Sequence, residues 1–392
     1  MSEAYLLAGC RTPVGKLLGS LASVPATKLG AIAVAEAVRR SGVPAEKVEE
    51  VIMGCVLPAG LGQAPARQAA LGAGLPHTVG ALTINKVCGS GLKAVALAAQ
   101  AIRAGDAQCI VAGGMENMTR APFLMTGVRE GWKFGAQQVL DSMQHDGLWC
   151  AFEDMAMGAE ADYIAAQRGV SRHDQDLFAV ESHRRAVAAA AAGKFNEEIV
   201  PVVIAGRKGE VRIDKDEGPR ADTALEVLAR LRPSFGADGT VTAGNASQIS
   251  DGAAALVVAS AEFARHAQSP IKARIVAAAT SGVAPKEIFI APVSAMEKVL
   301  HKAKMTMADM DLVELNEAFA AQCLACMRPL DVNPAKTNVN GGAIALGHPI
   351  GASGARVLVT LLYALADRGL KRGLASLCLG GGNAVAMIVE RE

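Results

Sequence analysis

A cysteine within a turn of small residues is the first candidate for chemistry in this chain of 392 residues. Cys88 lies in the run Asn85…Cys88-Gly-Ser-Gly91, after residues typical of a strand and before residues typical of a helix. Free backbone N–H groups and the dipole at a helix N-terminus favour the thiolate. The small residues leave room for a substrate and for N–H groups that face a developing oxyanion. Cys88 is therefore either a nucleophile or a small residue buried in a packing turn, and the local pattern leaves both interpretations open.

A histidine inside a glycine-rich run is the second candidate. His348 lies between Asn340 and Gly354, with Pro349 directly after it. Proline fixes the backbone beside the imidazole, and the glycines allow close packing. Because imidazole is the natural base for a thiol, we predict that His348 accepts a proton from the nucleophile. The alternative is a cap for the following helix.

Two more polar groups follow apolar runs typical of strands. Cys378 precedes Leu379-Gly-Gly-Gly-Asn383, so it is either an acid–base group beside bare backbone amides or an ordinary strand residue. Asn316 opens the run Asn316-Glu-Ala-Phe319. Its amide could orient a water or donate to an oxyanion, or it could cap the next helix.

Metal, phosphate and redox motifs fit the chain poorly. Cys323-x-x-Cys326 has the spacing of zinc and redox motifs, but no second cysteine pair and no nearby histidine accompanies it, so core packing is expected. The glycine runs match no phosphate-binding fingerprint. We therefore expect no metal ion and no resident cofactor.

Composition excludes further classes of protein. The 39 Lys and Arg residues balance 38 Asp and Glu residues, so the chain has no electrostatic footprint for nucleic acid. The longest uncharged stretches, 68–85 and 373–389, are broken by glycine, so no membrane span is expected. An acidic N-terminus differs from a signal peptide, and eight scattered cysteines are typical of reduced thiols. We expect a cytoplasmic protein.

Alternating helix-like and strand-like runs must position these groups. Helices are expected at 28–40, 91–104, 318–328 and 357–366, and strands at 48–56, 82–87, 109–112, 253–259, 313–315 and 375–379. This alternation predicts an α/β fold with helix-covered sheets. Residues 121–245 differ in composition and indicate an insertion over the core, with a long helix beginning near Ser171. The last third repeats the first in outline, which predicts an internal duplication.

Taken together, these motifs resemble the thiolase family along nearly the whole chain. The resemblance implies an α/β thiolase-like fold, with two duplicated βαβαβαββ halves in a five-layered α-β-α-β-α core. It implies an N-terminal half at 1–120 plus 246–270, a loop domain at 121–245 covering the CoA site, and a C-terminal half at 271–392. It also implies a homodimer or, more often in short-chain members, a homotetramer.

The resemblance implies roles for the reactive groups. Thiolases join two acetyl-CoA into acetoacetyl-CoA and CoA by Claisen condensation, or cleave a 3-ketoacyl-CoA in reverse. Cys88 would take the acyl group as a thioester, with His348 accepting its proton, and Cys378 would then deprotonate the second acetyl-CoA. His348 and a water held by Asn316 would stabilise the enolate. The N–H groups of Cys88 and Gly380 would form the second oxyanion hole.

The family pattern also implies residues that contact the CoA thioester. Arg220 would lie near the adenine. The pantetheine would be bordered by Phe235, Ala243 and Ser247, and the acyl end by Leu148, Met157, Ala318 and Phe319.

Two positions depart from the pattern of short-chain members. Ala156 stands where acetoacetyl-specific relatives often have histidine, and Ile288-Phe289 stands where bacterial relatives often have Met-Gly. Both would lie near the acyl pocket, so chain length stays open. Ping-pong condensation of two acetyl-CoA is the expected activity. The alternative is a degradative 3-ketoacyl-CoA thiolase of broader chain length in fatty-acid β-oxidation.

Overall fold

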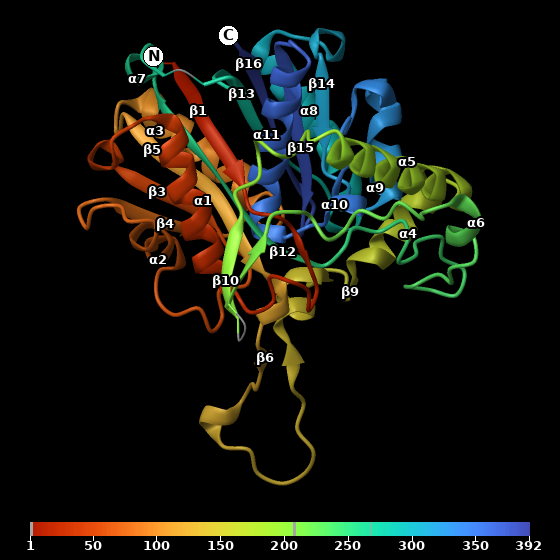
Figure 1. Ribbon diagram of the computed structural model, residues 1–392. Coiled ribbons are helices and arrows are strands. Elements are labelled where there is room, and N and C mark those ends of the chain that lie inside the picture. Colours follow the sequence, from red (N-terminus) through yellow and green to blue (C-terminus); the bar gives the residue numbers. More distant parts are fainter. Residues whose placement is uncertain (1–2, 207–208, 268) are drawn as a thin grey trace.

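The computed structural model describes residues 3–206, 209–267 and 269–392. Its N-terminal half has five main strands in one sheet, with three helices packed against the two faces of that sheet (Figure 1). The strands are β1 (Ala4–Arg11), β3 (Glu50–Gly54), β4 (Gly80–Ile84), β5 (Cys109–Asn117) and β12 (Ser250–Ser260), and the short β2 (Gly15–Lys16) pairs with β12. The helices are α1 (Ala26–Ser41), α2 (Pro65–Gly72) and α3 (Ser90–Ala104). Glycines in the left-handed region, Gly42 and Gly105, end α1 and α3.

The C-terminal half follows the same plan after a short helix α7 (Ala261–Ala264). Its strands are β13 (Ala273–Gly282), β14 (Leu312–Leu315), β15 (Arg372–Leu379) and β16 (Asn383–Arg391). Its helices are α8 (Ala291–Ala303), α9 (Ala320–Met327), α10 (Ala343–Leu346) and α11 (Ile350–Asp367). The strand that would correspond to β4 is reduced to an isolated bridge between Val313 and Thr337.

Strand order confirms the duplicated α/β fold. The order is β14-β15-β16-β13-β1-β12-β5-β3-β4, so each half places its first strand at the junction and its last strand next to it. Within the sheet, as far as the described residues show, the strands of the two halves are joined by two residue pairs between β1 and β13. Both strand sets contact α11, which packs beside α3 in the middle, while α1 and α2 cover one outer face and α8 and α9 the other (Figure 1). This is the five-layered arrangement that the resemblance to thiolases implies.

Side-chain alternation along the strands fills the layers. In β12, Leu256 and Val258 face the central helices, while Val257 and Ala259 face α1. A strand buried on both faces has a continuous apolar sequence, as residues 253–259 do. Of the helices among the described residues, only α11 is long and apolar enough to cross a membrane, and 83% of it is buried inside the protein, as in a core helix.

The two central helices, α3 and α11, cross at glycines, so neither helix has a side chain at the crossing point. A Cβ on Gly91 of α3 would lie 2.6 Å from the backbone nitrogen of Ala355, and a Cβ on Gly354 of α11 would collide with Leu92. The backbones therefore touch directly, and this contact fixes the relative position of the two helix N-termini. Cys88 precedes one N-terminus and His348 the other.

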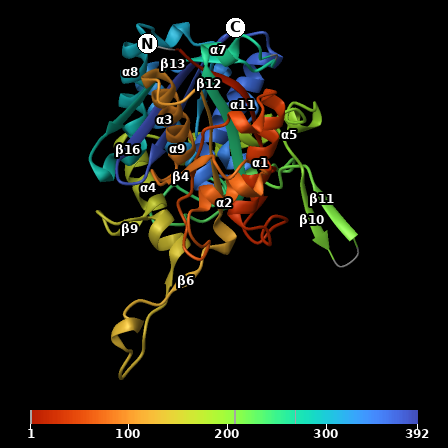
Figure 2. The ribbon, with the colours of Figure 1, turned by 90° about the vertical axis from the view of Figure 1, so that its left-hand side faces the viewer.

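Residues 118–249 leave the core between β5 and β12. They include two helices, α4 (Met157–Gln167) and α5 (Arg172–Ala191), the short α6 (Leu225–Leu228) and the π-helical turn η4 (Met143–Leu148). Short strand pairs are β6 (Phe123–Leu124) with β7 (Leu140–Asp141), β8 (Trp149–Cys150) with β9 (Met155–Ala156), and β10 (Val202–Gly206) with β11 (Gly209–Ile213). The β6–β7 and β10–β11 hairpins project from the body (Figure 2). The expected domain boundaries at 120, 245 and 270 stay predictions.

Local expectations were met unevenly. Helix α5 begins after Ser171, whose side chain accepts a hydrogen bond from the N–H of Asp174 at 3.1 Å, as predicted. The predicted C-terminal boundary of the strand expected at 82–87 is wrong, because β4 ends at Ile84. Residues 85–89 instead form the turn that carries Cys88, and Val87 there has a φ of +46°, which no strand residue adopts.

Candidate active site

One cavity of about 850 Å³ collects the reactive groups predicted from the sequence. Cys88, His348 and Cys378 all line it, although 290 residues separate the first from the last. The cavity opens between the N-termini of α3 and α11 and the insertion. Three groups capable of nucleophilic or proton-transfer chemistry therefore share one volume large enough for part of a thioester substrate.

The turn before α3 presents Cys88 on the cavity wall. The N–H of Val87 donates to the Asn85 side chain at 2.9 Å, and the Ser90 hydroxyl donates to the Val87 carbonyl at 2.7 Å. Burial raises the pKa of the Cys88 thiol to about 12, while the N–H groups of Cys88 and Gly380 lower it. Burial thus outweighs the helix N-terminus, so Cys88 rests as a thiol and needs a base.

His348 has the geometry of that base. Its Nδ1 lies 2.6 Å from the Ser353 hydroxyl, which itself donates to the Pro349 carbonyl at 2.8 Å. Because that hydroxyl proton is already used, Ser353 accepts from Nδ1–H, and the lone pair is left on Nε2. Nε2 has no partner among the described residues. Burial, and secondarily the Arg356 charge, lower the pKa of His348 to about 3, so the imidazole is neutral and can accept a proton.

Cys378 lies at the end of β15, with 2% of its surface exposed. Burial raises the pKa of this thiol well above its usual value, and the nearby Cys88 adds to the rise. A thiolate at this position is therefore strongly basic. Such a base suits the removal of a proton from carbon, which is only weakly acidic.

The last two predicted catalytic residues, Gly380 and Asn316, lie in different surroundings. Gly380 lines the cavity, and a Cβ on it would lie 3.1 Å from a methyl of Val87. Asn316 does not line the cavity; it is 1% exposed behind β15, where its N–H donates to the Ser376 carbonyl at 3.0 Å. Neither polar atom of its side chain has a partner among the described residues. A buried amide without a partner is costly unless a water or ligand satisfies it.

All eight residues predicted for the CoA thioester line the same cavity: Arg220, Phe235, Ala243, Ser247, Leu148, Met157, Ala318 and Phe319. Phe319 packs edge-on against Phe235 and Phe289, with ring centroids 6.4 and 5.1 Å apart. The Phe235 ring packs directly on Gly158, because a Cβ on residue 158 would overlap the ring. The structure thus brings together every predicted site residue except the Asn316 side chain.

Several residues that form or support the cavity were not predicted from the sequence. The cavity is also lined by Lys16, Met118, Met143, Gln144, Ile249 and Ile350. Glu116 is buried at the end of β5 and accepts hydrogen bonds from the N–H groups of Val56, Leu57 and Gly351 at 2.9–3.2 Å. It ties the start of α11 to the loop after β3. In the sequence, this role is indicated by a single acidic residue at the end of the apolar run that closes with Gly113-Gly114-Met115-Glu116.

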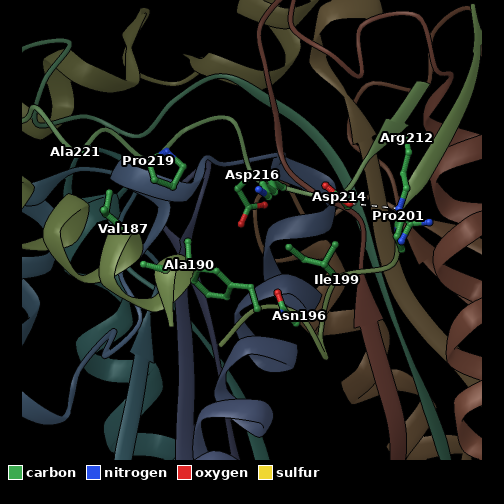
Figure 3. A pocket seen from close by; sticks show the side chains of 13 residues that line it. Val187, Ala190, Asn196, Ile199, Pro201, Arg212, Asp214, Asp216, Pro219 and Ala221 are labelled. Carbon is green, nitrogen blue, oxygen red and sulfur yellow. Dashed lines mark hydrogen bonds and ion pairs between the residues drawn. The ribbon is translucent and has the colours of Figure 1, made fainter. Parts of the chain in front are cut away.

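The remaining candidates carry no comparable chemistry. Cys323 and Cys326 are fully buried, and Cys326 donates to the Phe289 carbonyl at 3.0 Å. A second cavity of about 700 Å³ lies between the end of α5 and residues 212–221 (Figure 3). It is lined by no cysteine or histidine, and its acids Asp214 and Asp216 are paired with Arg212 and Arg11. The described residues contain no cluster of three or more His, Cys, Asp or Glu side chains able to hold a metal ion.

Comparison with known families agrees with this geometry. The family model "Thiolase, N-terminal domain" matches residues 4–262, and "Thiolase, C-terminal domain" matches residues 269–391. The chain belongs to the thiolase family. Two thiolases named acetyl-CoA acetyltransferase, from Pseudomonas aeruginosa and Cupriavidus necator, are each 52% identical to it, with 100% of both chains covered.

A solved structure extends the likeness to three dimensions. The crystal structure of the Bacillus anthracis acetyl-CoA acetyltransferase is 42% identical, with a TM-score of 0.97, and the match covers 100% of this chain and 99% of that one. The thiolase fold predicted from the sequence is therefore confirmed.

Proposed function

We propose that this thiolase is an acetyl-CoA acetyltransferase, which condenses two acetyl-CoA into acetoacetyl-CoA and CoA by way of a thioester on Cys88. The observation that supports this proposal most strongly is that Cys88, His348 and Cys378 line one cavity. Full-length relatives at 52% identity that are named acetyl-CoA acetyltransferase support the acetyl substrate. CoA thioesters are thus the substrates, and side chains and backbone N–H groups of the cavity supply the catalytic groups described below.

Acyl transfer to Cys88 is the first half-reaction. The thiol gives its proton to Nε2 of His348 as the sulfur attacks the carbonyl carbon of acetyl-CoA. The carbon–sulfur bond to CoA then breaks, and the departing CoA sulfur takes the proton from His348. The N–H groups of Cys88 and Gly380 stabilise the oxyanion between these steps.

Carbon–carbon bond formation is the second half-reaction. Cys378 first loses its thiol proton to solvent, which its raised pKa makes infrequent. The thiolate then takes a proton from the methyl group of a second acetyl-CoA, and His348 with a water at Asn316 stabilises the enolate oxygen. The enolate carbon attacks the acetyl group, the bond to the Cys88 sulfur breaks, and Cys378 returns the proton from carbon to that sulfur. Cys88 is again a thiol and Cys378 again the thiolate, which can regain its proton from solvent, so the cycle closes.

Two assays test the proposal. Mass spectrometry after brief mixing with acetyl-CoA should find an acetyl group on the peptide that contains Cys88, and added CoA should remove it. Thiolysis rates should be higher with acetoacetyl-CoA than with 3-ketooctanoyl-CoA. Absence of an adduct in folded protein would refute acyl transfer, whereas faster cleavage of the longer substrate would refute the acetyl preference and favour a degradative thiolase.

Assembly and location are part of the proposal. A homotetramer is supported by the projecting β6–β7 hairpin, on which Phe123, Met125 and Phe134 are more than half exposed. Apolar side chains grouped on a projection typically become covered by another protein surface. A cytoplasmic location is supported by the eight free cysteines.

A further inference from the structure

The backbone directly before the nucleophile is in a conformation that its residue type disfavours. Val87 has a φ of +46°, and of the seven non-glycine residues with positive φ in the described part of the chain it alone is β-branched. In this region the Cβ crowds the neighbouring carbonyl oxygen, and a branched Cβ makes the crowding worse. A glycine would relieve the crowding, yet the chain has valine.

Surrounding contacts hold Val87 in this conformation. Its N–H is bound by the Asn85 side chain and its carbonyl by both the N–H and the hydroxyl of Ser90. The same hydroxyl accepts the N–H of Lys86 at 2.8 Å. Both ends of the Val87 residue are thus fixed independently of its side chain. Strain that is over-determined in this way is typical of functional sites.

The side chain of Val87 explains why glycine is not used. Its methyl groups lie against Gly380, where a Cβ would come within 3.1 Å of them, and it packs against the apolar cluster formed by Val56, Leu57, Met118 and Ile350. Gly380 carries one of the two N–H groups that face the Cys88 sulfur, and Cys88 itself carries the other. One residue therefore borders both donors: it precedes one in the chain and packs against the other in space.

We propose that Val87 is a positioning residue, whose left-handed backbone aims the N–H of Cys88 and whose side chain fixes the N–H of Gly380 at the same point. This inference rests on the proposed acyl transfer at Cys88. The strain is the cost of placing an L-residue with a packing side chain at a position where the backbone must turn sharply.

Three substitutions separate the backbone from the side chain. V87T keeps the branched shape, V87A removes the methyl groups but keeps the crowded Cβ, and V87G removes both. V87T should be acetylated by acetyl-CoA within about threefold of the unmodified enzyme, and V87G at least about tenfold more slowly, since a misplaced oxyanion donor costs that much or more. V87G should nevertheless melt about 1–2 °C above V87A, because glycine relieves the strain.

Alkylation of Cys88 by iodoacetamide provides a second readout, which a merely structural role would not move. Because the two N–H groups stabilise the thiolate, V87G should need a higher pH than V87T to reach the same alkylation rate. Acetylation of V87G at the unmodified rate, or melting of V87G below V87A, would each overturn the inference. Failure of the unmodified enzyme to be acetylated would instead refute the proposed function, while the alkylation profiles would still test Val87.

Discussion

Substitution of Ser353 by alanine should slow acetylation of Cys88 because Ser353 sets the tautomer of His348. The serine hydroxyl accepts the Nδ1–H at 2.6 Å and so leaves the lone pair on Nε2. Without it, the reactive tautomer buries an N–H that has no acceptor, which costs about 1–3 kcal/mol. The pKa of His348, lowered to about 3 mainly by burial, keeps the ring neutral in both proteins. We expect acetylation to be roughly 10- to 100-fold slower in S353A.

Rapid mixing with acetyl-CoA, acid quenching and intact mass measurement give the acetylation rate directly. S376A is a matched control, because Ser376 is also fully buried and donates to a backbone carbonyl, that of Val385 at 3.0 Å, whereas the hydrogen bond to the ring of His348 comes from Ser353. Both variants lose a buried hydroxyl, so their melting temperatures should fall similarly. Acetylation of S353A within threefold of the S376A rate would show that the hydroxyl does not select the tautomer.

Four further outcomes are expected. The variant C378A should be acetylated at the unmodified rate but form no acetoacetyl-CoA, measured by absorbance; loss of acetylation as well would contradict separate roles for the two thiols. Acetylation should be flat from pH 5 to 9, because the pKa of His348 is near 3 and that of Cys88 near 12, so the neutral pair persists throughout. Condensation should instead rise up to tenfold per pH unit, because burial holds the pKa of Cys378 above this range; a pH-independent condensation rate would refute a thiolate base. F289A removes a fully buried ring that lines the cavity, so the free energy of unfolding should fall by about 3–5 kcal/mol. The ratio of kcat/KM for 3-ketooctanoyl-CoA to that for acetoacetyl-CoA should rise at least tenfold. An unchanged ratio would show that another residue limits the chain length.

Residue types and local spacing were sufficient to find the groups that react. Cys88 and His348 stand in glycine-rich turns where few structural reasons would place them, and the repeated outline of the chain indicated two similar halves. The resemblance to thiolases then placed Arg220 and Phe235 in the same cavity, where the structure has them.

Groups that act through a second residue could not be predicted in this way. Ser353 acts by orienting the ring of His348, which the sequence pattern around it does not reveal. Glu116 acts through hydrogen-bond partners 60 and 235 positions away, which leave no local pattern. The conformation of Val87 runs against its own propensity, so residues 82–87 were predicted as one strand. The pKa of Cys88 likewise depends on burial, which a turn of small residues does not reveal.

The glycine crossing of α3 and α11 has a consequence for the origin of the site. A single half has a bare helix face that only an equivalent helix can cover, which is the geometry of a twofold pair of identical chains. In such a pair, the same sequence would have preceded both helices. In the single chain each helix is preceded by its own sequence, so the turn before α3 can be specialised for Cys88 and the turn before α11 for His348.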